Sequence, residues 1–368
     1  MSQVLGVINL MNENQFLKEL TSSRCLASVP FGGRYRLIDF TLSDFVHADV
    51  TQVAVFAREK YRSLMDHLGS GKEWDLDRHN GGLFILPPLK PGEKMMGDIQ
   101  QFYDHLMFFQ RSYADTVIIS PGCHVCEIDY TEIIDQHRVN NADITIVYKD
   151  YKGVPVQKPV YHKCSVDDDG NISDIELYAS PQEGDLVCLE TYILKKTVLV
   201  ELILKCIEND EYDFIKDALK AHLDDYVVKG YHLKGEMMFI HSVESFHQGN
   251  MAFLNQKVMH SFFNDKREVF TKIKHEAPTK YTLSSAVSHS LIANGCDIQG
   301  TVENSILFRG VKVKKGAVVK NSIIMQKGEI EEGAYVENVI TDKQAKITKD
   351  QKVIGKSKPK VIKKAEMI

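Results

Sequence analysis

The sequence predicts an α/β domain followed by a left-handed parallel β-helix. Over roughly the first 255 residues, apolar runs that favour strands alternate with amphipathic patterns that favour helices. This alternation is typical of a sheet covered by helices on both faces. From residue 302 onward the chain instead repeats itself with a period of 17 residues, and apolar residues recur near every sixth position within each repeat.

The first domain carries its pattern in six segments. Four apolar runs favour strands, namely VLGVIN (4–9), TQVAVFAR (51–58), DTVIISPG (115–122) and ADITIVYK (142–149). Two longer segments favour amphipathic helices, namely DIQQFYDHLMFFQRS (98–112) and YTEIIDQHRVN (130–140). Strands alternating with helices of this length indicate βαβ units. In such sheets, ligands bind beyond the carboxyl ends of the strands.

The repeats of the second domain are visible by eye. VENSI at 302–306 matches VKNSI at 319–323 and VENVI at 336–340. Each coil of such a β-helix buries its apolar residues and stacks on the next coil. Segment 286–300 is expected to add an irregular first coil. The expected boundaries are therefore an α/β domain over 1–255, a linker over 256–284, the β-helix over 285–358 and a solvated basic tail over 359–368.

Composition excludes several classes of protein. The chain has 368 residues and a net charge of −5, so nothing suggests a general nucleic-acid or membrane binder. No apolar run is long enough to span a bilayer, and the N-terminal residues lack a signal-peptide pattern. Seven cysteines include one CxxC, Cys123 and Cys126, without the second pair that a zinc site would require. We therefore favour reduced thiols in a cytoplasmic protein over metal or redox chemistry.

Acyl transfer is an alternative that the β-helix raises. Short-period β-helices also occur in acyltransferases that use a histidine as a base. The repeats from 302 to 353 contain no histidine, and His289 lies just before them. We therefore favour assembly with a partner as the role of this domain.

Four stretches carry a resemblance to a known family. They are VPFGGRYRLIDFTLSD (29–44), WDLDRHNGGLFILPP (74–88), YDFIKDAL (212–219) and VENSILFRGVKV (302–313). They look like segments of bacterial glucose-1-phosphate adenylyltransferase, also called ADP-glucose pyrophosphorylase, and the resemblance covers nearly the whole chain. It implies a Rossmann-like nucleotidyltransferase (GT-A-like) domain joined to a left-handed β-helix of hexapeptide repeats. Members of this family make ADP-glucose and pyrophosphate from ATP and glucose 1-phosphate.

The family's phosphate-binding loop has no counterpart of the same chemistry here. The family opens with a glycine-rich loop, GGxGxRL, and residues 11–17 (MNENQFL) take its place without a glycine. Loss of the glycines removes the close approach of backbone N–H groups to phosphate. Phe16 stands where the family has an arginine, Glu13 adds a repelling carboxylate, and Leu26 stands where the family has a lysine linked to the nucleotide.

The resemblance also implies a magnesium site that this sequence lacks. Cys123 and Phe239 take the places of the family's two metal-binding aspartates, and neither is a suitable ligand for magnesium. Tyr178 lies near the place of the lysine that binds the sugar phosphate. We therefore expect no metal site and no cofactor, with Mg²⁺ and ATP bound only if the cleft is still active.

The pattern of losses resembles a particular branch of the family. Many Gram-positive bacteria pair a catalytic subunit with a D-type glycogen-biosynthesis subunit, which has little or no activity alone. The resemblance implies a regulatory, catalytically impaired subunit in a heterotetramer with the catalytic subunit, with self-association also open. Two alternatives stay open at this point. One is an active adenylyltransferase that holds its metal through Asp98 or Asp129, and the other is a module that senses a sugar phosphate or a nucleotide.

Several remaining residues are candidates for binding. In the family, this front segment is connected with effectors that are phosphorylated metabolites or nucleotides, which suits Arg24, Arg34 and Arg36. A purely structural alternative is that Arg34 and Arg36 are surface ion-pair residues beside Asp39. The residual cleft would include four residues, namely Gly97, Asp98, Gly122 and His124. The carboxylates of the WDLDR stretch, Asp75 and Asp77, are expected to be structural.

Overall fold

The computed structural model describes residues 3–11, 17–89, 95–153, 161–263 and 267–368. The chain divides into two compact units, which are described separately below. The first unit contains residues 1–14 and 40–237, and the second contains residues 15–39 and 238–368. Glu13 and Phe16, which the sequence placed in the altered phosphate loop, lie outside the described residues.

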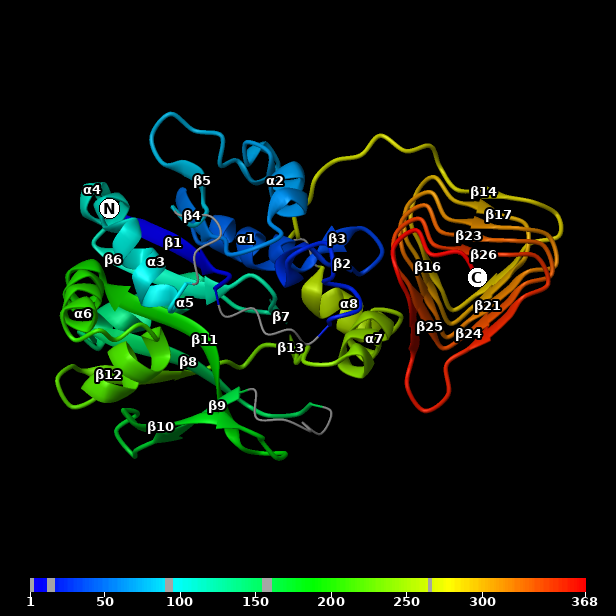
Figure 1. Cartoon of the computed structure of the whole chain (residues 1–368). Coiled ribbons are helices and arrows are strands. Elements are labelled where there is room, and N and C mark those ends of the chain that lie inside the picture. Colours follow the sequence, from blue (N-terminus) through cyan, green and yellow to red (C-terminus); the bar gives the residue numbers. More distant parts are fainter. Residues whose placement is uncertain (1–2, 12–16, 90–94, 154–160, 264–266) are drawn as a thin grey trace. The chain divides into compact units, whose positions relative to one another are not determined.

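The first unit is built on a mixed nine-stranded sheet (Figure 1). Its path runs β10 (Ile172–Ala179), β9 (Tyr161–Val166), β11 (Leu186–Lys195), β6 (Thr116–Pro121), β1 (Val4–Asn9), β4 (Gln52–Phe56) and β5 (Gly82–Leu86). Off this path, β8 (Ile144–Asp150) pairs with β11 and with β12 (Val228–His232). Strands β6, β1, β4 and β5 are parallel, as the βαβ pattern predicts. Strand β11 is antiparallel to both β6 and β8, so the sheet is not the purely parallel one that the pattern suggests.

Helices cover both faces of this sheet. They are α1 (Leu37–His47), α2 (Arg62–Leu68), α3 (Asp98–Asp104), α4 (Leu106–Arg111), α5 (Tyr130–Val139) and α6 (Lys196–Glu208), with short helical turns at Lys72–Trp74, Phe214–Leu219 and Lys220–His222. Apolar residues of α3 and α6 share one core with Leu5 and Val7 of β1. On the other face, Gly6 of β1 allows the ring of Phe45 to approach, because an added Cβ would lie 2.8 Å from that ring. Phe45 also contacts Tyr130 of α5, with ring centroids 5.0 Å apart.

The predicted helix over 98–112 is divided into α3 and α4. The division falls at His105, whose backbone is not helical (φ −108°, ψ 23°). Its ring nitrogen Nε2 lies 3.0 Å from the carbonyl oxygen of Pro87, and its ring contacts Phe56 edge to face. This hydrogen bond and the packing fix His105 at the break. Sequence periodicity does not detect such long-range contacts.

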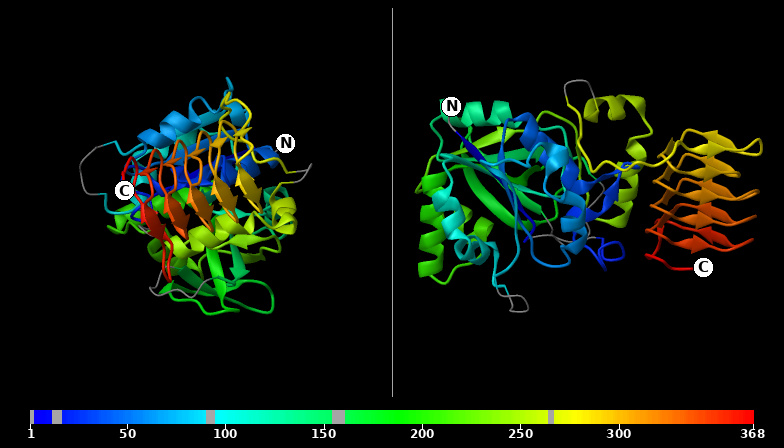
Figure 2. Two further views of the ribbon diagram at one scale, coloured as in Figure 1. Left: turned by 90° about the vertical axis from the view of Figure 1, so that its right-hand side faces the viewer. Right: turned by 90° about the horizontal axis from the view of Figure 1, so that it is seen from above.

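The second unit contains the predicted β-helix, which consists of three parallel five-stranded sheets. The first contains β14 (Lys280–Tyr281), β17 (Asp297–Ile298), β20 (Lys312–Val313), β23 (Glu329–Ile330) and β26 (Lys346–Ile347). The second contains β15 (Ala286–Ser288), β18 (Thr301–Glu303), β21 (Val318–Lys320), β24 (Tyr335–Glu337) and β27 (Lys352–Ile354). The third contains β16 (Leu291–Ile292), β19 (Ile306–Leu307), β22 (Ile323–Ile324), β25 (Val339–Thr341) and β28 (Lys360–Ile362). Figure 2 shows the coils stacked one on another.

The strand register confirms the repeat. Val302 pairs with Val319, which pairs with Val336, so that each partner is 17 residues further along. These valines are fully buried in a core that runs through the stack. The first coil is irregular, as expected, since Val287 pairs with Val302 at a spacing of 15 residues.

The ends of the β-helix differ from the expected boundaries. The first sheet begins at Lys280, inside the expected linker, and the last coil includes Lys360–Ile362, which the sequence assigned to a solvated basic tail. Ile362 is buried against the core, and Thr348 donates a hydrogen bond to the carbonyl oxygen of Ile368. The sequence did not predict this coil because the segment is rich in lysine. Only one face of each short strand needs to be apolar, so lysines can occupy the other face.

The remainder of the second unit is small, and aromatic side chains pack together in it. It includes a helical turn at Leu26–Ser28, the hairpin strands β2 (Pro30–Phe31) and β3 (Tyr35–Arg36), and the helices α7 (Val243–Ala252) and α8 (Gln256–Phe262). Phe31 packs edge to face on Phe246 and Phe253. Gly32 has a positive φ of 58°, and its N–H donates to the buried side chain of Asn250 at 2.9 Å. Helix α8 occupies the start of the segment that the sequence assigned to a linker.

Two short strands, β7 (Val125–Cys126) and β13 (Met237–Met238), form a separate pair.

Among the described residues, no helix combines the length and the apolar character that a membrane crossing requires.

Candidate functional site

Asp98 marks the candidate site of the first unit. It begins α3 and is 1% exposed. Its Oδ2 accepts a hydrogen bond from the side-chain amide of Asn9 at the end of β1 (3.0 Å), and its Oδ1 accepts one from the N–H of Phe214 (2.8 Å). The pKa of Asp98 is raised to about 6, mainly by burial; the charge of Asp213 also raises it, and the hydrogen bonds from Phe214 and Asn9 lower it. Gly97 is required here for space, because an added Cβ would lie 2.0 Å from the carbonyl oxygen of Tyr212.

Glu190 adds a second carboxyl group of unusual pKa. Burial raises the pKa of Glu190 to about 7, and the negative charges of Asp98 and Asp213 contribute in the same direction. Asp98, Glu190 and Asp213 therefore form a carboxyl cluster whose members come from three distant parts of the chain. Sequence reasoning singled out Asp98 but missed the other two, and Asp213 was visible only as part of the YDFIKDAL stretch.

Tyr178 joins this carboxyl cluster. It lies on β10 with a positive φ of 52°, and 54% of its surface is exposed. Its hydroxyl lies 3.3 Å from Oδ2 of Asp213 and donates a hydrogen bond to it, and its ring packs against His162 with centroids 5.1 Å apart. Burial and the charge of Asp213 raise the pKa of Tyr178, so the hydroxyl stays protonated. Where the resemblance implies a lysine for the sugar phosphate, the chain thus presents a phenol bound to a carboxylate.

The end of β6 carries the other predicted residues of this unit. Gly122, Cys123 and His124 follow Pro121 directly, and Cys123 is partly exposed. Burial lowers the pKa of His124 to about 4, so the imidazole is neutral near pH 7. Cys126 is buried, and the described part of the chain contains no group of three or more His, Cys, Asp or Glu side chains placed to hold a metal ion.

The carboxyl cluster is chemically unsuited to a phosphate. The charged groups that shift the pKa of Glu190 are both carboxylates, and Tyr178 contributes an uncharged hydroxyl. A phosphate placed beside them would meet repulsion in a poorly solvated environment, where charge interactions are strong. Asp129, the other carboxylate considered as a metal ligand, caps α5 by accepting from the N–H groups of Thr131 and Glu132.

Two further family positions belong to the second unit. Leu26 lies in the helical turn at its start, and Phe239 precedes α7. Both side chains are buried and apolar, which accounts for them as core residues of that unit.

The predicted arginines also lie in the second unit and differ in their surroundings. Arg24 is 2% exposed and forms a buried ion pair with Asp342 of the β-helix, which gives it a structural partner. Arg34 is exposed, and its guanidinium lies 5.5 Å from the ring centroid of Tyr35. The carboxylate of Asp39 accepts from the backbone N–H of Arg36 and from the hydroxyl of Thr271, at 2.9 and 2.6 Å.

Two cations that sequence reasoning missed lie close to these arginines. Burial, followed by the charges of Arg36 and Arg24, lowers the pKa of Lys343 to about 7. Burial and the charge of Arg34 lower the pKa of Arg309. We call Arg34, Arg36, Arg309 and Lys343 the basic cluster. No local motif revealed it, because Arg309 and Lys343 are contributed by separate coils.

The WDLDR stretch forms a local loop. Arg78 pairs with the carboxylate of Asp75, and Asp77 accepts a hydrogen bond from the hydroxyl of Ser70 at 3.2 Å. These contacts hold the loop together and account for both carboxylates.

Replacing Glu190 with glutamine should change how stability depends on pH. The pKa of Glu190 is raised from 4.5 to about 7 in the folded chain, so between these values the folded state keeps a proton that the unfolded state has lost. The contribution of Glu190 to stability therefore falls as the pH rises through this window. We expect Glu190→Gln to raise Tm more at about pH 8 than at about pH 5. Thermal unfolding at a series of pH values measures this difference.

The control for that experiment is Glu183→Gln, which changes an exposed carboxylate in the turn before β11. Its effect on Tm should be small at both pH values. An equal Tm change for Glu190→Gln at both ends of the range would contradict the carboxyl cluster as described.

Comparisons with known proteins agree with this architecture. Residues 15–256 match the family described as nucleotidyl transferase, and residues 274–363 match the GlmU-like C-terminal hexapeptide family. The chain is 38% identical over 366 residues to the glycogen biosynthesis protein GlgD of Bacillus subtilis (strain 168), covering 99% of this chain and 96% of the relative. It is 37% identical over 321 residues to GlgD of Geobacillus stearothermophilus, covering 86% of this chain and 83% of the relative.

Similarity extends to enzymes with a named activity. The chain is 32% identical over 328 residues to the glucose-1-phosphate adenylyltransferase of Thermotoga sp. (strain RQ2), covering 87% of this chain and 77% of the relative. Both predicted domains are therefore confirmed as to type, and the resemblance seen in the sequence is confirmed across nearly the whole chain. The chain belongs to the glucose-1-phosphate adenylyltransferase family.

Proposed function

We propose that this chain is a regulatory, catalytically impaired subunit that associates with the catalytic subunit of glucose-1-phosphate adenylyltransferase in cytoplasmic glycogen biosynthesis. The observation that carries the proposal is the carboxyl cluster, in which Tyr178 binds Asp213 and the charges of Asp98 and Asp213 act on Glu190. Enzymes that transfer phosphoryl-type groups rely on cations to neutralise developing charge, and Tyr178 offers an uncharged hydroxyl near the place where the resemblance implies a lysine.

The alternative of an active enzyme with substitute metal ligands receives little support. Asp98 is already hydrogen-bonded to Asn9 and Phe214, and Asp129 is occupied as the cap of α5. These hydrogen bonds give both carboxylates structural roles. Similarity to two GlgD proteins along most of the chain supports the regulatory role and suggests a heteromeric assembly.

The activity of the purified chain tests this proposal. We expect no measurable ADP-glucose synthesis from ATP, glucose 1-phosphate and Mg²⁺ by the chain alone. Mixed with the catalytic subunit of the same organism, it should co-elute on gel filtration and change the rate or the effector response of that subunit. Robust turnover by the chain alone would overturn the proposal, and so would a mixture that neither co-elutes nor changes in activity.

We further propose that the basic cluster of the second unit receives a phosphorylated effector. Arg34 is exposed, and burial, followed by the charges of nearby arginines, lowers the pKa of Lys343 and of Arg309, so a bound anion would relieve the repulsion between these cations. In the mixed assay, Lys343→Gln should weaken the effector response, whereas Lys327→Gln, a change in the turn after β22, should leave it unchanged. An unchanged response in Lys343→Gln would remove this residue from effector binding.

A further inference from the structure

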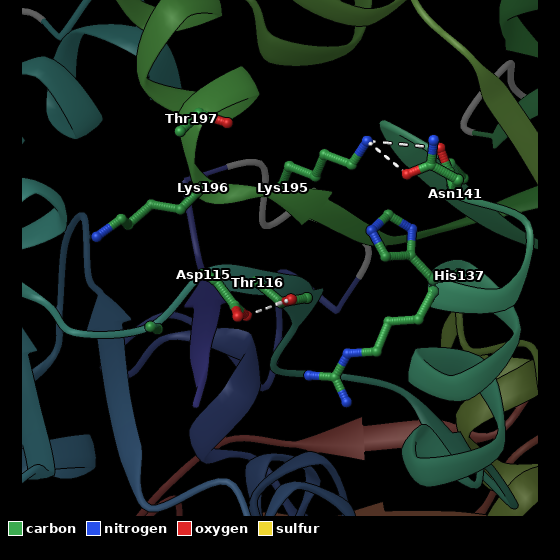
Figure 3. Close-up of a pocket in the computed structure, with 10 residues that line it drawn as sticks. Asp115, Thr116, His137, Asn141, Lys195, Lys196 and Thr197 are labelled. Atoms are coloured by element: carbon green, nitrogen blue, oxygen red, sulfur yellow. Dashed lines mark hydrogen bonds between the residues drawn. The ribbon is translucent and has the colours of Figure 1, made fainter. Parts of the chain in front are cut away.

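A pocket of about 500 Å³ lies in the first unit at the end of the sheet where β6 begins. Its walls come from the start of β6 (Asp115, Thr116), the end of α5 (His137, Arg138) and the start of α6 (Lys195, Lys196). Cys123 follows the other end of β6, so the pocket and the candidate site are separated by the length of that strand. Figure 3 shows the labelled side chains around the pocket. A pocket of this volume suits a small metabolite.

The pocket is predominantly cationic. Arg138, Lys195 and Lys196 line it together with one carboxylate, Asp115. The ammonium group of Lys195 lies 2.8 Å from Asp143, which is not part of the lining, and that of Lys196 donates to the carbonyl oxygen of Ser112 at 2.6 Å. The lining therefore carries an excess of positive charge.

The start of α6 adds hydrogen-bond donors to the same pocket. This helix has 13 residues, its N-cap is Lys195, and no side chain caps it within the part of the chain that the structure describes. The N–H of Lys196 donates to the carbonyl oxygen of Asp115 at 2.8 Å. The next N–H groups of the first turn have no acceptor within the helix and lie at the positive end of its dipole. An uncapped helix start of this kind favours an anion.

His137 provides an independent sign of a ligand. Its side chain is 3% exposed, and its Nδ1 lies 2.8 Å from the hydroxyl oxygen of Thr145. Its other nitrogen, Nε2, is buried and has no hydrogen-bond partner among the described residues. In Figure 3 the imidazole points into the space between α5 and the start of α6. A buried polar atom without a partner is costly, and a bound acceptor would remove that cost.

The charge state of His137 fits the role of a neutral donor. Burial and the charges of Lys195 and Arg138 lower the pKa of His137 to about 4, and the opposing contribution of Asp143 is smaller. The imidazole is therefore neutral near pH 7 and carries one N–H. When the Thr145 hydroxyl donates to Nδ1, that N–H is at Nε2, and His137 is one of the residues that line the pocket.

We propose that this pocket binds a small phosphate-bearing molecule, whose oxygens accept hydrogen bonds from Nε2 of His137 and from the first turn of α6. Lys195, Lys196 and Arg138 supply the positive potential that attracts the anion. A sugar phosphate has the required size and charge, and inorganic phosphate shares the chemistry of the anchoring group. The pocket involves neither the carboxyl cluster nor the basic cluster, so the proposal does not depend on the regulatory role.

The test is binding of inorganic phosphate and of glucose 1-phosphate to the full chain, measured by calorimetry, with glucose as the uncharged control. We expect both phosphates to bind and glucose not to bind. In ¹⁵N spectra of the native chain, phosphate should shift the Nε2 resonance of His137. This spectroscopic measurement needs no variant, so it remains informative if a substitution fails to fold.

Two substitutions of His137 distinguish the hydrogen bond of Nδ1 to Thr145 from the proposed hydrogen bond of Nε2 to phosphate. Asparagine can retain the hydrogen bond to Thr145 but cannot reach the pocket, so His137→Asn should weaken phosphate binding by about tenfold or more. Glutamine can place an N–H near the position of Nε2, so His137→Gln should bind more tightly than His137→Asn. Two further variants each remove one positive charge from α6. Lys196→Gln should weaken phosphate binding, whereas Lys205→Gln, further along the helix, should not.

Failure of phosphate to bind the native chain would overturn the proposal. It would also be overturned if phosphate bound but neither shifted the His137 resonance nor bound more weakly to Lys196→Gln, because the anion would then lie elsewhere. Neither result would affect the assay of the regulatory role, which measures turnover with the catalytic subunit.

Discussion

Replacing Asp342 with asparagine is expected to lower the free energy of unfolding by about 3–5 kcal/mol, because it removes one partner of a buried ion pair. The guanidinium of Arg24 is almost wholly buried, and its Nη2 contacts both carboxylate oxygens of Asp342. Its Nη1 has no hydrogen bond to any described residue, and among the described residues Asp342 is the acidic partner of this cation. Asparagine keeps the shape of the side chain but leaves the positive charge uncompensated. Urea denaturation of the full chain measures the loss.

The control is Glu332→Gln, which also removes one negative charge from the β-helix. Glu332 and Lys349 are 62% and 63% exposed and lie 3.6 Å apart. Exposed pairs contribute about 0–1 kcal/mol, so this substitution should have little effect on stability. The double variant Arg24→Met, Asp342→Leu should recover much of the loss, because no buried charge remains in it. A loss of less than about 1 kcal/mol in Asp342→Asn would contradict the account of Arg24 as a buried structural cation.

Arg24 also shows what sequence reasoning can and cannot supply. The sequence shows that an arginine is present near the front of the chain, and the resemblance suggested an effector role. It does not show that the partner lies 318 residues further along. The carboxyl cluster could not be predicted from the sequence for the same reason, since residues 98, 190 and 213 are brought together only by the packing of the sheet and its helices. Local patterns carry no information on such encounters.

Periodic features, by contrast, were predictable. The 17-residue repeat predicts the register of three sheets, because each coil must place equivalent apolar side chains on the same side of the next. The parallel strands β1, β4 and β6 follow from apolar runs between amphipathic helices. Strand β11 was not identified, and its antiparallel direction depends on which neighbours it pairs with rather than on its own composition.

Restoring the two missing aspartates of the family pattern should not restore catalysis. We expect the double variant Cys123→Asp, Phe239→Asp to make ADP-glucose at less than about 1% of the rate of the catalytic subunit, because loss of a single charge-stabilising group in an enzyme already costs about 10²–10³-fold. Residues 11–17 would still contain no glycine, and Tyr178 would still bind Asp213 instead of providing a cation. A metal held by the new carboxylates could not replace these contacts to phosphate.

The control is the double variant Cys123→Asn, Phe239→Asn. Asparagine matches aspartate in size, so both double variants remove the same thiol and the same buried ring, and they differ only in charge. Mg²⁺ binding that appears in the aspartate variant alone, without turnover, would show that the metal ligands can be rebuilt while the phosphate contacts remain absent. Turnover at the level of the catalytic subunit would instead show that the two aspartates are sufficient. In that event, neither the altered loop nor the carboxyl cluster could account for the lack of activity that we expect of the chain alone.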